Sequence, residues 1–323
     1  MRLDSLASVP VPTLEQALRE MPLVRVRKNS RGEAQPSLRG ATDRHIAVLV
    51  DGVPLTLGWD HRTDLSIIPL TAARSVHLLR GLPSVLNGPN VLAGVVSIDV
   101  ARGHERLAAP PRATLSASVD QDGSLILGGT VSRSLESGGG DWLVQGGGGF
   151  RDRPGVSIPG SDSGALGNVA LLTDDGDLRL NSDLRHKDAF VSIRYQGDED
   201  GWMSLTSSGF DVERGVPPET HEADPRLWRY PDQWRVITAL SGGTGPKETG
   251  WGMGDLEASV GFDVGSFRLE QFDAPTFQNV IEEEEGDDRT VTLRVLGEHS
   301  VGERGDVRTA LTYADVSHTE RLA

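Results

Sequence analysis

The chain has 323 residues, enough for one large or two ordinary domains with a full-sized core. It contains no cysteine, which excludes disulfide scaffolds, thiolate metal sites and cysteine nucleophiles. The net charge of −15 argues against nucleic-acid binding, which needs clustered lysine and arginine. Residues 1–100 hold 11 basic and 9 acidic residues (+2), whereas the remainder holds 21 basic and 38 acidic residues (−17). Two regions with different charge balance indicate two domains.

The N-terminal residues 1–8 lack the uninterrupted apolar segment of a secretory signal. No run of 18 or more apolar residues predicts a membrane-spanning helix, so a chain that crosses a membrane must do so as a barrel of strands. Because residue 1 is methionine, we interpret the missing signal as an incomplete gene model rather than as the numbering of a mature form.

Short mixed elements are predicted in the first hundred residues. Thr13 to Glu20 has the pattern of a short helix capped by Thr13, and Val24 to Lys28 alternates as a strand does. His45 to Val50 is a buried-strand candidate, ended by an Asp51-Gly52 turn. These elements describe a small α/β domain at residues 1–111. The stretch from Ala108 to Pro111 has linker composition, and a second domain follows at 112–323.

Residues 74–100 are punctuated by glycines. An apolar strand over 75–79 ends at Arg80-Gly81, a short helical segment over 84–87 ends at Gly88, and Gly94 begins a β-branched run to residue 100. Glycine at such points permits a positive φ or a close approach of the backbone to its neighbours.

After Arg112 the sequence alternates with a period of two, and we count about ten strands of roughly ten residues, with one apolar and one polar face. Charges on the polar face suit a water-filled lumen. Long connections at 151–176 and 197–232, alternating with tight ones such as Arg185 to Asp188, are typical of barrels with long outer loops. The predicted polar-face charges are Arg179, Asp183, Arg185, Arg194, Glu257 and Asp263.

Three glycine motifs in order carry a resemblance to a known family. These are Leu38-Arg39-Gly40, Asp51-Gly52-Val53-Pro54, and Arg80-Gly81 followed by Ala93-Gly94. Over residues 13–100 the chain resembles the plug domain of TonB-dependent outer-membrane receptors. The later part fits their antiparallel transmembrane β-barrel by architecture. In the last motif the chain departs from the family at Leu82-Pro83, where the proline is shifted, and at Asn87, which replaces a tyrosine.

The resemblance implies a barrel of about 22 strands, of which this chain supplies about ten. Ten strands cannot enclose the plug, so we expect a fragment truncated at both ends. The expected location is the outer membrane of a Gram-negative cell, in contact with its lipid.

The resemblance further implies active transport of a scarce nutrient, energised by the TonB protein, with no enzymatic activity and no cofactor. A ferric siderophore is the leading cargo, and cobalamin, haem or another metal complex are the alternatives. Residues 1–12 show no convincing coupling peptide for TonB.

The resemblance also assigns roles to plug residues. Arg39 and Arg80 correspond to plug arginines that pair with barrel carboxylates and lock the plug, and a plain surface salt bridge is the competing interpretation. The turn glycines of the plug are Gly40, Gly52, Gly81, Gly88 and Gly94.

Other candidate sites are weaker. Asp60, His61 and Asp64, with Trp59 beside them, form a possible ligand or metal contact, but no paired metal-ligand spacing supports a metal site. Ser241 to Glu248 lacks the Ser or Thr of a phosphate loop, and the acidic run at 282–288 lacks the spacing of a calcium loop. Possible members of an aromatic girdle are Trp142, Trp234, Trp251 and Tyr313.

Two other classes of protein remain open from the residues alone. A soluble or surface all-β ligand-binding domain has the same two-faced strands. A β-rich enzyme acting on polysaccharide depends only on scattered carboxylates.

Overall fold

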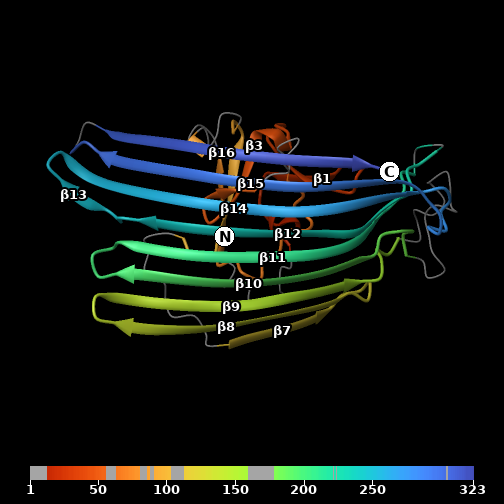
Figure 1. The fold of residues 1–323 in the computed structure, drawn as a ribbon, viewed down its shortest axis with the longest axis horizontal. Coiled ribbons are helices and arrows are strands. Elements are labelled where there is room, and N and C mark those ends of the chain that lie inside the picture. Colours follow the sequence, from red (N-terminus) through yellow and green to blue (C-terminus); the bar gives the residue numbers. More distant parts are fainter. Residues whose placement is uncertain are drawn as a thin grey trace.

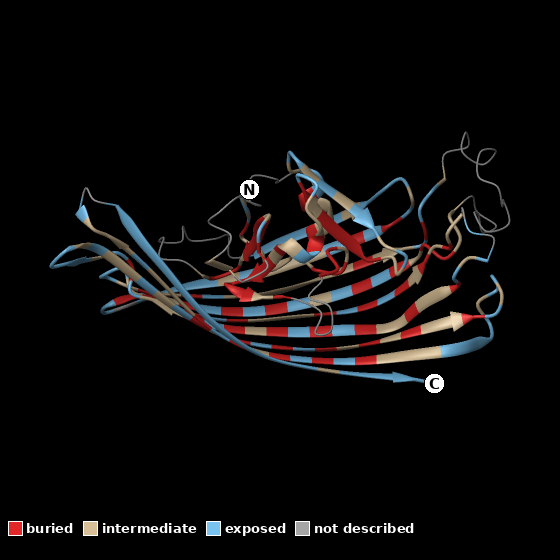
Figure 2. Cartoon of the chain, turned by 90° about the horizontal axis from the view of Figure 1, so that it is seen from above, coloured by how far each residue is buried: buried red, intermediate tan, exposed pale blue. Residues whose placement is uncertain are grey.

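The structure is a computed structural model that describes residues 13–55, 63–80, 86–87, 91–102, 113–158, 178–220, 222, 224–302 and 305–323. It contains an N-terminal unit of short elements and a long curved antiparallel sheet, which we call the wall (β7–β16, Figure 1). The N-terminal unit lies against the concave face of the wall (Figure 2).

The N-terminal unit is built on a four-stranded mixed sheet in the order β4-β3-β6-β5, in which β3 and β6 are parallel. A two-stranded hairpin, a short helix and a 3-10 turn complete it. The elements are α1 (Leu14–Arg19), β1 (Val24–Lys28), β2 (Ala34–Leu38), η2 (Asp43–His45), β3 (Ile46–Val50), β4 (Val53–Pro54), β5 (Ser75–Arg80) and β6 (Gly94–Asp99).

Apolar side chains of this unit form its core. Leu14 and Leu18 of α1 pack with strand residues such as Val48 and Val96, and all four are at most 1% exposed. The helix predicted at 13–20 is present, but the Thr13 side chain makes no capping hydrogen bond. Instead, the backbone N–H of Leu14 donates to the Ile68 carbonyl at 3.0 Å, so tertiary contact replaces the predicted local cap.

Within the described residues the wall has ten antiparallel strands, which agrees with the predicted count. Nine of them form a continuous meander, and the short β13 pairs only with β14. Its main strands are longer than the predicted ten residues, reaching 21 residues in β14 and β15. They are β7 (Ala113–Val119), β8 (Leu125–Ser137), β9 (Gly140–Arg153), β10 (Leu184–Gly197), β11 (Trp202–Val216), β12 (Trp228–Gly243), β13 (Lys247–Thr249), β14 (Gly252–Phe272), β15 (Val280–Ser300) and β16 (Asp306–Leu322).

Two of the predicted connections are wrong. The supposed tight turn from Arg185 to Asp188 lies within β10, and the supposed long connection at 197–232 contains the whole of β11. Charged residues occur on both faces near the strand ends, so the period of two that defines a strand fades there. Much of the third connection, at 151–176, lies outside the described residues, as does the predicted linker at 108–111.

The two faces of the wall have the polarity that the alternation predicts. Leu256, Val260 and Phe262 of β14 point away from the N-terminal unit, whereas Asp263 on the same strand points inward and is 2% exposed. The inward face is mostly polar, but Phe190 and Ile237 join the core of the N-terminal unit. Leu184, Phe210 and Val212 also face inward, where they pack with Ile67 of that unit. Buried inward polar residues are Arg151, His186, Ser192, Arg194, Gln196, Ser204, Thr206, Arg214, Gln233, Arg235, Ser241, Ser259, Asp263, Asp288, Thr290, Thr292 and Arg294.

An apolar belt crosses the outward face. On β14 it runs from Leu256 to Val264, which is about 27 Å along the strand and close to the roughly 9–11 residues with which a tilted strand crosses a bilayer. Beyond Val264 the outward residues of β14 are polar or charged, as at Arg268. The outer ends of β14 and β15 therefore continue past the belt.

The predicted outer-face aromatics occupy different places. Trp142 packs on Tyr195 at a centroid distance of 4.9 Å beside the short turns, and Trp234 lies at the opposite edge of the belt, before the outward Asp232. Trp251 is exposed beside the β13 turn. Tyr313 faces outward in the middle of the belt, opposite Leu293, so its assignment to a girdle is wrong.

Connections of different length lie at the two ends of the wall (Figure 1). One end has the connections β8–β9, β10–β11, β12–β14 and β15–β16, and the other has the connections β7–β8, β9–β10, β11–β12 and β14–β15. We call these the short-turn end and the long-loop end. At the long-loop end Arg185 faces outward, opposite Glu213 across the ladder, so its assignment to the polar inner face is wrong.

Candidate functional site

The contact between the N-terminal unit and the inner face of the wall is the candidate functional site. At the long-loop end, Arg214 of β11 forms an ion pair with Asp64 at 2.8 Å, and the two side chains are 6% and 2% exposed. The other carboxylate oxygen of Asp64 accepts hydrogen bonds from the backbone N–H groups of Ala34 and Ser66. Arg214 also lies 4.6 Å from the ring centroid of Tyr230, so its charge is enclosed by protein on several sides.

Glu33 lies beside this ion pair and is buried. Burial raises the pKa of Glu33 above its ordinary value, and the nearby Asp64 carboxylate raises it further. A hydrogen bond of 2.6 Å from the Asn29 side-chain amide acts in the opposite direction. Ionisation of the Glu33 carboxyl at the apex of the β1–β2 hairpin is therefore unfavourable.

A second ion pair links this apex to another strand. The guanidinium of Arg31 donates to both carboxylate oxygens of Glu284 on β15, at 2.8 and 3.0 Å. Arg31 also lies 5.7 Å from the ring centroid of Trp228. Burial alone would lower the pKa of the Arg31 guanidinium, but the hydrogen-bonded Glu284 carboxylate and other nearby groups raise it, so the cation stays charged. A bidentate pair of this type fixes geometry as well as charge.

At the short-turn end the Asp51 carboxylate is fully buried. It accepts hydrogen bonds from the backbone N–H groups of Val100, Ala101 and Arg102 and from the hydroxyl of Thr206 on β11. Burial raises the pKa of Asp51, and these four donors oppose the rise. The carboxylate thus ties the end of the N-terminal unit to the wall.

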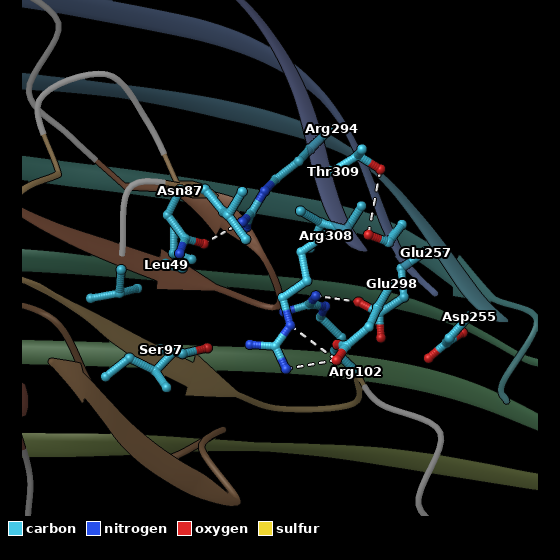
Figure 3. Close-up of a pocket in the computed structure, with 15 residues that line it drawn as sticks. Leu49, Asn87, Ser97, Arg102, Asp255, Glu257, Arg294, Glu298, Arg308 and Thr309 are labelled. Carbon is cyan, nitrogen blue, oxygen red and sulfur yellow. Dashed lines mark hydrogen bonds and ion pairs between the residues drawn. The ribbon is translucent and has the colours of Figure 1, made fainter. Parts of the chain in front are cut away.

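A cavity of about 390 Å³ separates the N-terminal sheet from β14, β15 and β16 (Figure 3). Arg102 donates to Glu257, and Arg294 reaches across the cavity to the Asn87 side-chain oxygen. Glu298 pairs with Arg308 at 2.6 Å on the far side. Charged side chains of both signs line one part of the gap, and apolar side chains such as Leu49 and Val95 line another.

A second cavity, of about 470 Å³, lies at the long-loop end. Lys28, Asn29 and Ser30 of the hairpin apex face the loop at 217–227 across it. The loop contributes Glu219, Glu222, Asp224 and Arg226.

The predicted locking residues occupy other positions. Arg39 is exposed in a turn with φ of 50°, and Arg80 donates to the Pro22 carbonyl at 2.7 Å within the N-terminal unit. Within the described residues neither arginine contacts a wall carboxylate, so their locking role stays a prediction. The ion pairs that do cross the interface are those of Asp64, Arg31 and Arg102.

The predicted turn glycines differ in what they require. Gly40 and Gly52 have a φ of 85° each, which favours glycine. Gly94 instead allows close packing, because an added Cβ would lie 2.7 Å from the Leu79 carbonyl oxygen. Gly81 and Gly88 lie outside the described residues, as do Trp59, Asp60 and His61. Among the described residues no group of three or more His, Asp or Glu side chains is placed to hold a metal ion.

The sequence reasoning missed Asp51, Arg214 and Glu284 as site residues. Asp51 has the appearance of an ordinary turn residue, and its partner Thr206 is 155 positions away. One signal was available. An arginine or a carboxylate on the inner face of the wall is covered by the N-terminal unit, so it needs an opposite charge on that unit.

The fold and the site define a plug seated against the inner face of a barrel wall. The sequence profile described as the TonB-dependent Receptor Plug Domain matches residues 2–95. In the described part of the chain no helix is long and apolar enough to cross a membrane.

Relatives with curated names support the same class. The Vitamin B12 transporter BtuB of Photobacterium profundum is 30% identical over 222 residues, which is 68% of this chain and 34% of that protein. Heme/hemopexin utilization protein C of Haemophilus influenzae is 33% identical over 96 residues, covering 29% of this chain and 13% of that protein.

Solved structures share the fold. The copper transporter OprC matches 98% of this chain with a TM-score of 0.74 and 16% identity, and the ferric citrate transporter FecA matches all of it with a TM-score of 0.59 and 13% identity. The chain covers 45% and 56% of those two chains. It thus spans about a third of the curated BtuB relative and about half of these solved chains.

The chain belongs to the TonB-dependent receptor family, with a plug domain followed by part of the barrel. This is a family of outer-membrane β-barrel receptors whose members are transporters rather than enzymes.

Proposed function

We propose that this chain takes part in active transport of a scarce nutrient across the outer membrane, energised by TonB. The observation that carries the proposal is the polar interface between plug and wall. The buried ion pair of Asp64, the partly buried pair of Arg102 with Glu257 and the bidentate pair of Arg31 hold the plug in place. Apolar contacts, such as that of Ile67 with Phe210, add to them. When the plug moves, the charged and polar groups in these contacts can form hydrogen bonds to water in place of their protein partners.

A ferric siderophore is the leading cargo. The long-loop cavity supports a hydrophilic cargo, because Lys28 and Asn29 face Glu219 and Asp224 across it. Named neighbours include transporters of ferric citrate, copper and vitamin B12 and a haem utilisation protein, so cobalamin, haem or another metal complex are the alternatives.

We also propose the division into a plug at residues 1–111 and a barrel portion at 112–323. The last plug strand ends at Asp99 and the first wall strand begins at Ala113, which supports a boundary between them.

A reversible cross-link tests whether the plug must move. A Cβ added at Gly32 would lie 3.8 Å from the Val216 Cβ, which is about the mean Cβ separation of a disulfide. The chain has no cysteine, so Gly32→Cys with Val216→Cys gives a single thiol pair. Because Gly32 has a positive φ, a cysteine at this position is strained by roughly 1–2 kcal/mol. We expect the disulfide to form despite this strain.

In cells that carry this double variant, oxidation is expected to abolish uptake of radiolabelled ferric siderophores, and a reductant is expected to restore it. The matched control is Thr114→Cys with Thr130→Cys, a cross-strand pair within the wall. Equal uptake by the oxidised and reduced plug–wall pair would contradict plug movement. Growth under iron limitation with defined siderophores tests the cargo, and the absence of an iron-linked phenotype would favour cobalamin, haem or another metal complex.

A further inference from the structure

The turn between β3 and β4 makes an unusual number of contacts with the wall. Asp51 and Gly52 are its central residues, with φ values of 45° and 85°, and Val50 and Val53 pair on either side. Positive φ at both central positions is the geometry of a type I′ hairpin turn, which projects tightly from its strands. The turn therefore forms a narrow projection on the plug.

The turn contacts four neighbouring wall strands, β11, β12, β14 and β15. Thr206 of β11 donates to the Asp51 carboxylate at 2.7 Å, and Ser241 of β12 donates to the Asp51 carbonyl at 3.2 Å. Arg294 of β15 donates to the Gly52 carbonyl at 3.0 Å. These three wall side chains are at most 3% exposed. If the plug shifted along the wall, the Asp51 carboxylate and the Asp51 and Gly52 carbonyls would lose these buried donors. The contacts therefore specify one position of the plug on the wall.

Between β12 and β15 the wall offers a glycine instead of a side chain. Gly261 of β14 lies directly against Val53, and an added Cβ there would come within 2.2 Å of Val53 Cγ1 and 2.7 Å of Cγ2. Even the Val53 Cβ would be only 3.0 Å away. Val53 is 2% exposed, so it has no free space into which to retreat. Val53 thus occupies the space that a side chain at position 261 would fill, and we call Gly261 the socket for this reason.

We infer that the Asp51–Pro54 turn is the positioning element that sets where the plug docks on the wall, and that Gly261 is the socket that admits it. The inference builds on the proposed function, in which the plug occupies the barrel. It assigns to the turn and to Gly261 a role in alignment rather than in cargo binding. The distant contacts at the long-loop end then depend on this alignment, because the plug is a single packed unit.

The test measures docking without measuring transport. The readout is the rate of disulfide formation between Gly32→Cys and Val216→Cys in the full chain, purified in detergent. Gly261→Ala is expected to lower this rate at least about tenfold, because overpacking of a fitted contact corresponds to roughly a ten- to hundredfold change in an equilibrium. Val53→Gly added to Gly261→Ala removes all three clashing carbons and is expected to restore most of the rate.

Two controls separate alignment from general destabilisation. Gly128→Ala makes the same change on β8, where the new Cβ would meet only the Ser116 hydroxyl. Leu14→Ala weakens the plug core at α1, outside the Asp51–Pro54 turn. The Gly128→Ala protein should cross-link at the parental rate, and the folded fraction of the Leu14→Ala protein should do the same.

An unchanged rate in Gly261→Ala, or a failure of Val53→Gly to restore it, would overturn the inference. So would an equal loss in the Gly128→Ala protein. Absence of nutrient uptake by a receptor in which the rest of the barrel completes this chain would count against the proposed function alone, since the cross-linking rate does not depend on transport.

Discussion

Replacing Asp64 by Asn tests how strongly the plug is held at the long-loop end. The amide keeps the size of the side chain and an oxygen that accepts from Ala34 and Ser66, but removes the negative charge that faces Arg214 at 2.8 Å. Removing one partner of a buried pair costs roughly 3–5 kcal/mol. Glu33 lies close enough to compensate in part, so we expect about 3 kcal/mol, or more than a hundredfold in the docking equilibrium.

The assay is protease cleavage of the plug in the purified full chain at increasing urea concentration. The Asp64→Asn protein should become cleavable at distinctly lower urea than the parent. The matched control is Glu213→Gln, which breaks a half-exposed pair with Arg185 at 3.8 Å. Exposed pairs contribute about 0–1 kcal/mol, so this control should stay close to the parent.

Two results would refute the reasoning. One is an Asp64→Asn protein that is no more sensitive than the Glu213→Gln protein. The other comes from the double variant Asp64→Asn with Arg214→Met. This variant removes both charges and should recover part of the lost resistance to urea. A double variant weaker than Asp64→Asn would show that Arg214 stabilises the plug through contacts other than this pair.

Three further predictions address acid, charge pairing and the belt. Because the pKa of Glu33 is raised in the folded state, its contribution to stability is fully present below its ordinary value of 4.5 and is lost as pH rises through the raised pKa. Glu33→Gln should flatten the melting temperature against pH in that range, and an unchanged slope would contradict the assignment. Arg31→Glu should loosen the plug in the urea assay, and Glu284→Arg added to it should restore retention if their pairing is what matters. Leu293→Arg in the belt should impair insertion into lipid vesicles by about 2–4 kcal/mol, measured by heat-modifiable electrophoretic mobility, whereas Ser266→Arg beyond the belt should cost about 0–1 kcal/mol. Equal effects of the two arginines would place the belt elsewhere.

The sequence predicts the two faces of the wall well, because side chains alternate strictly along a strand and burial acts on each face separately. Leu256 to Val264 follow this rule throughout. The rule fails at Arg185, where the strand has left the apolar belt and both faces tolerate charge. Strand limits near such positions cannot be read from alternation, and for this reason the predicted turn at 185–188 falls inside β10. The predicted connection at 197–232 contains the whole of β11.

The interface was harder to predict than the fold. Arg31 and Glu284 are 253 positions apart, and no local pattern in either segment identifies the other. The glycine motif at Asp51 correctly indicated a turn, but its contacts with Thr206 and Ser241 depend on how two sheets that are distant in sequence meet. Gly261 carries no signal of its own, since glycine in a strand is compatible with a bulge or a bend as well as with a socket.

The polar inner face of the wall has a consequence for how water behaves around the plug. Ser192, Ser204 and Thr292 are at most 2% exposed while the plug is seated. If the plug withdraws, these hydroxyl groups are hydrated at once, so a vacated lumen fills with water instead of collapsing on itself. The same side chains that line the closed structure would then line a water-filled channel, and the free energy of opening would include separating the charged, hydrogen-bonded and apolar contacts between plug and wall.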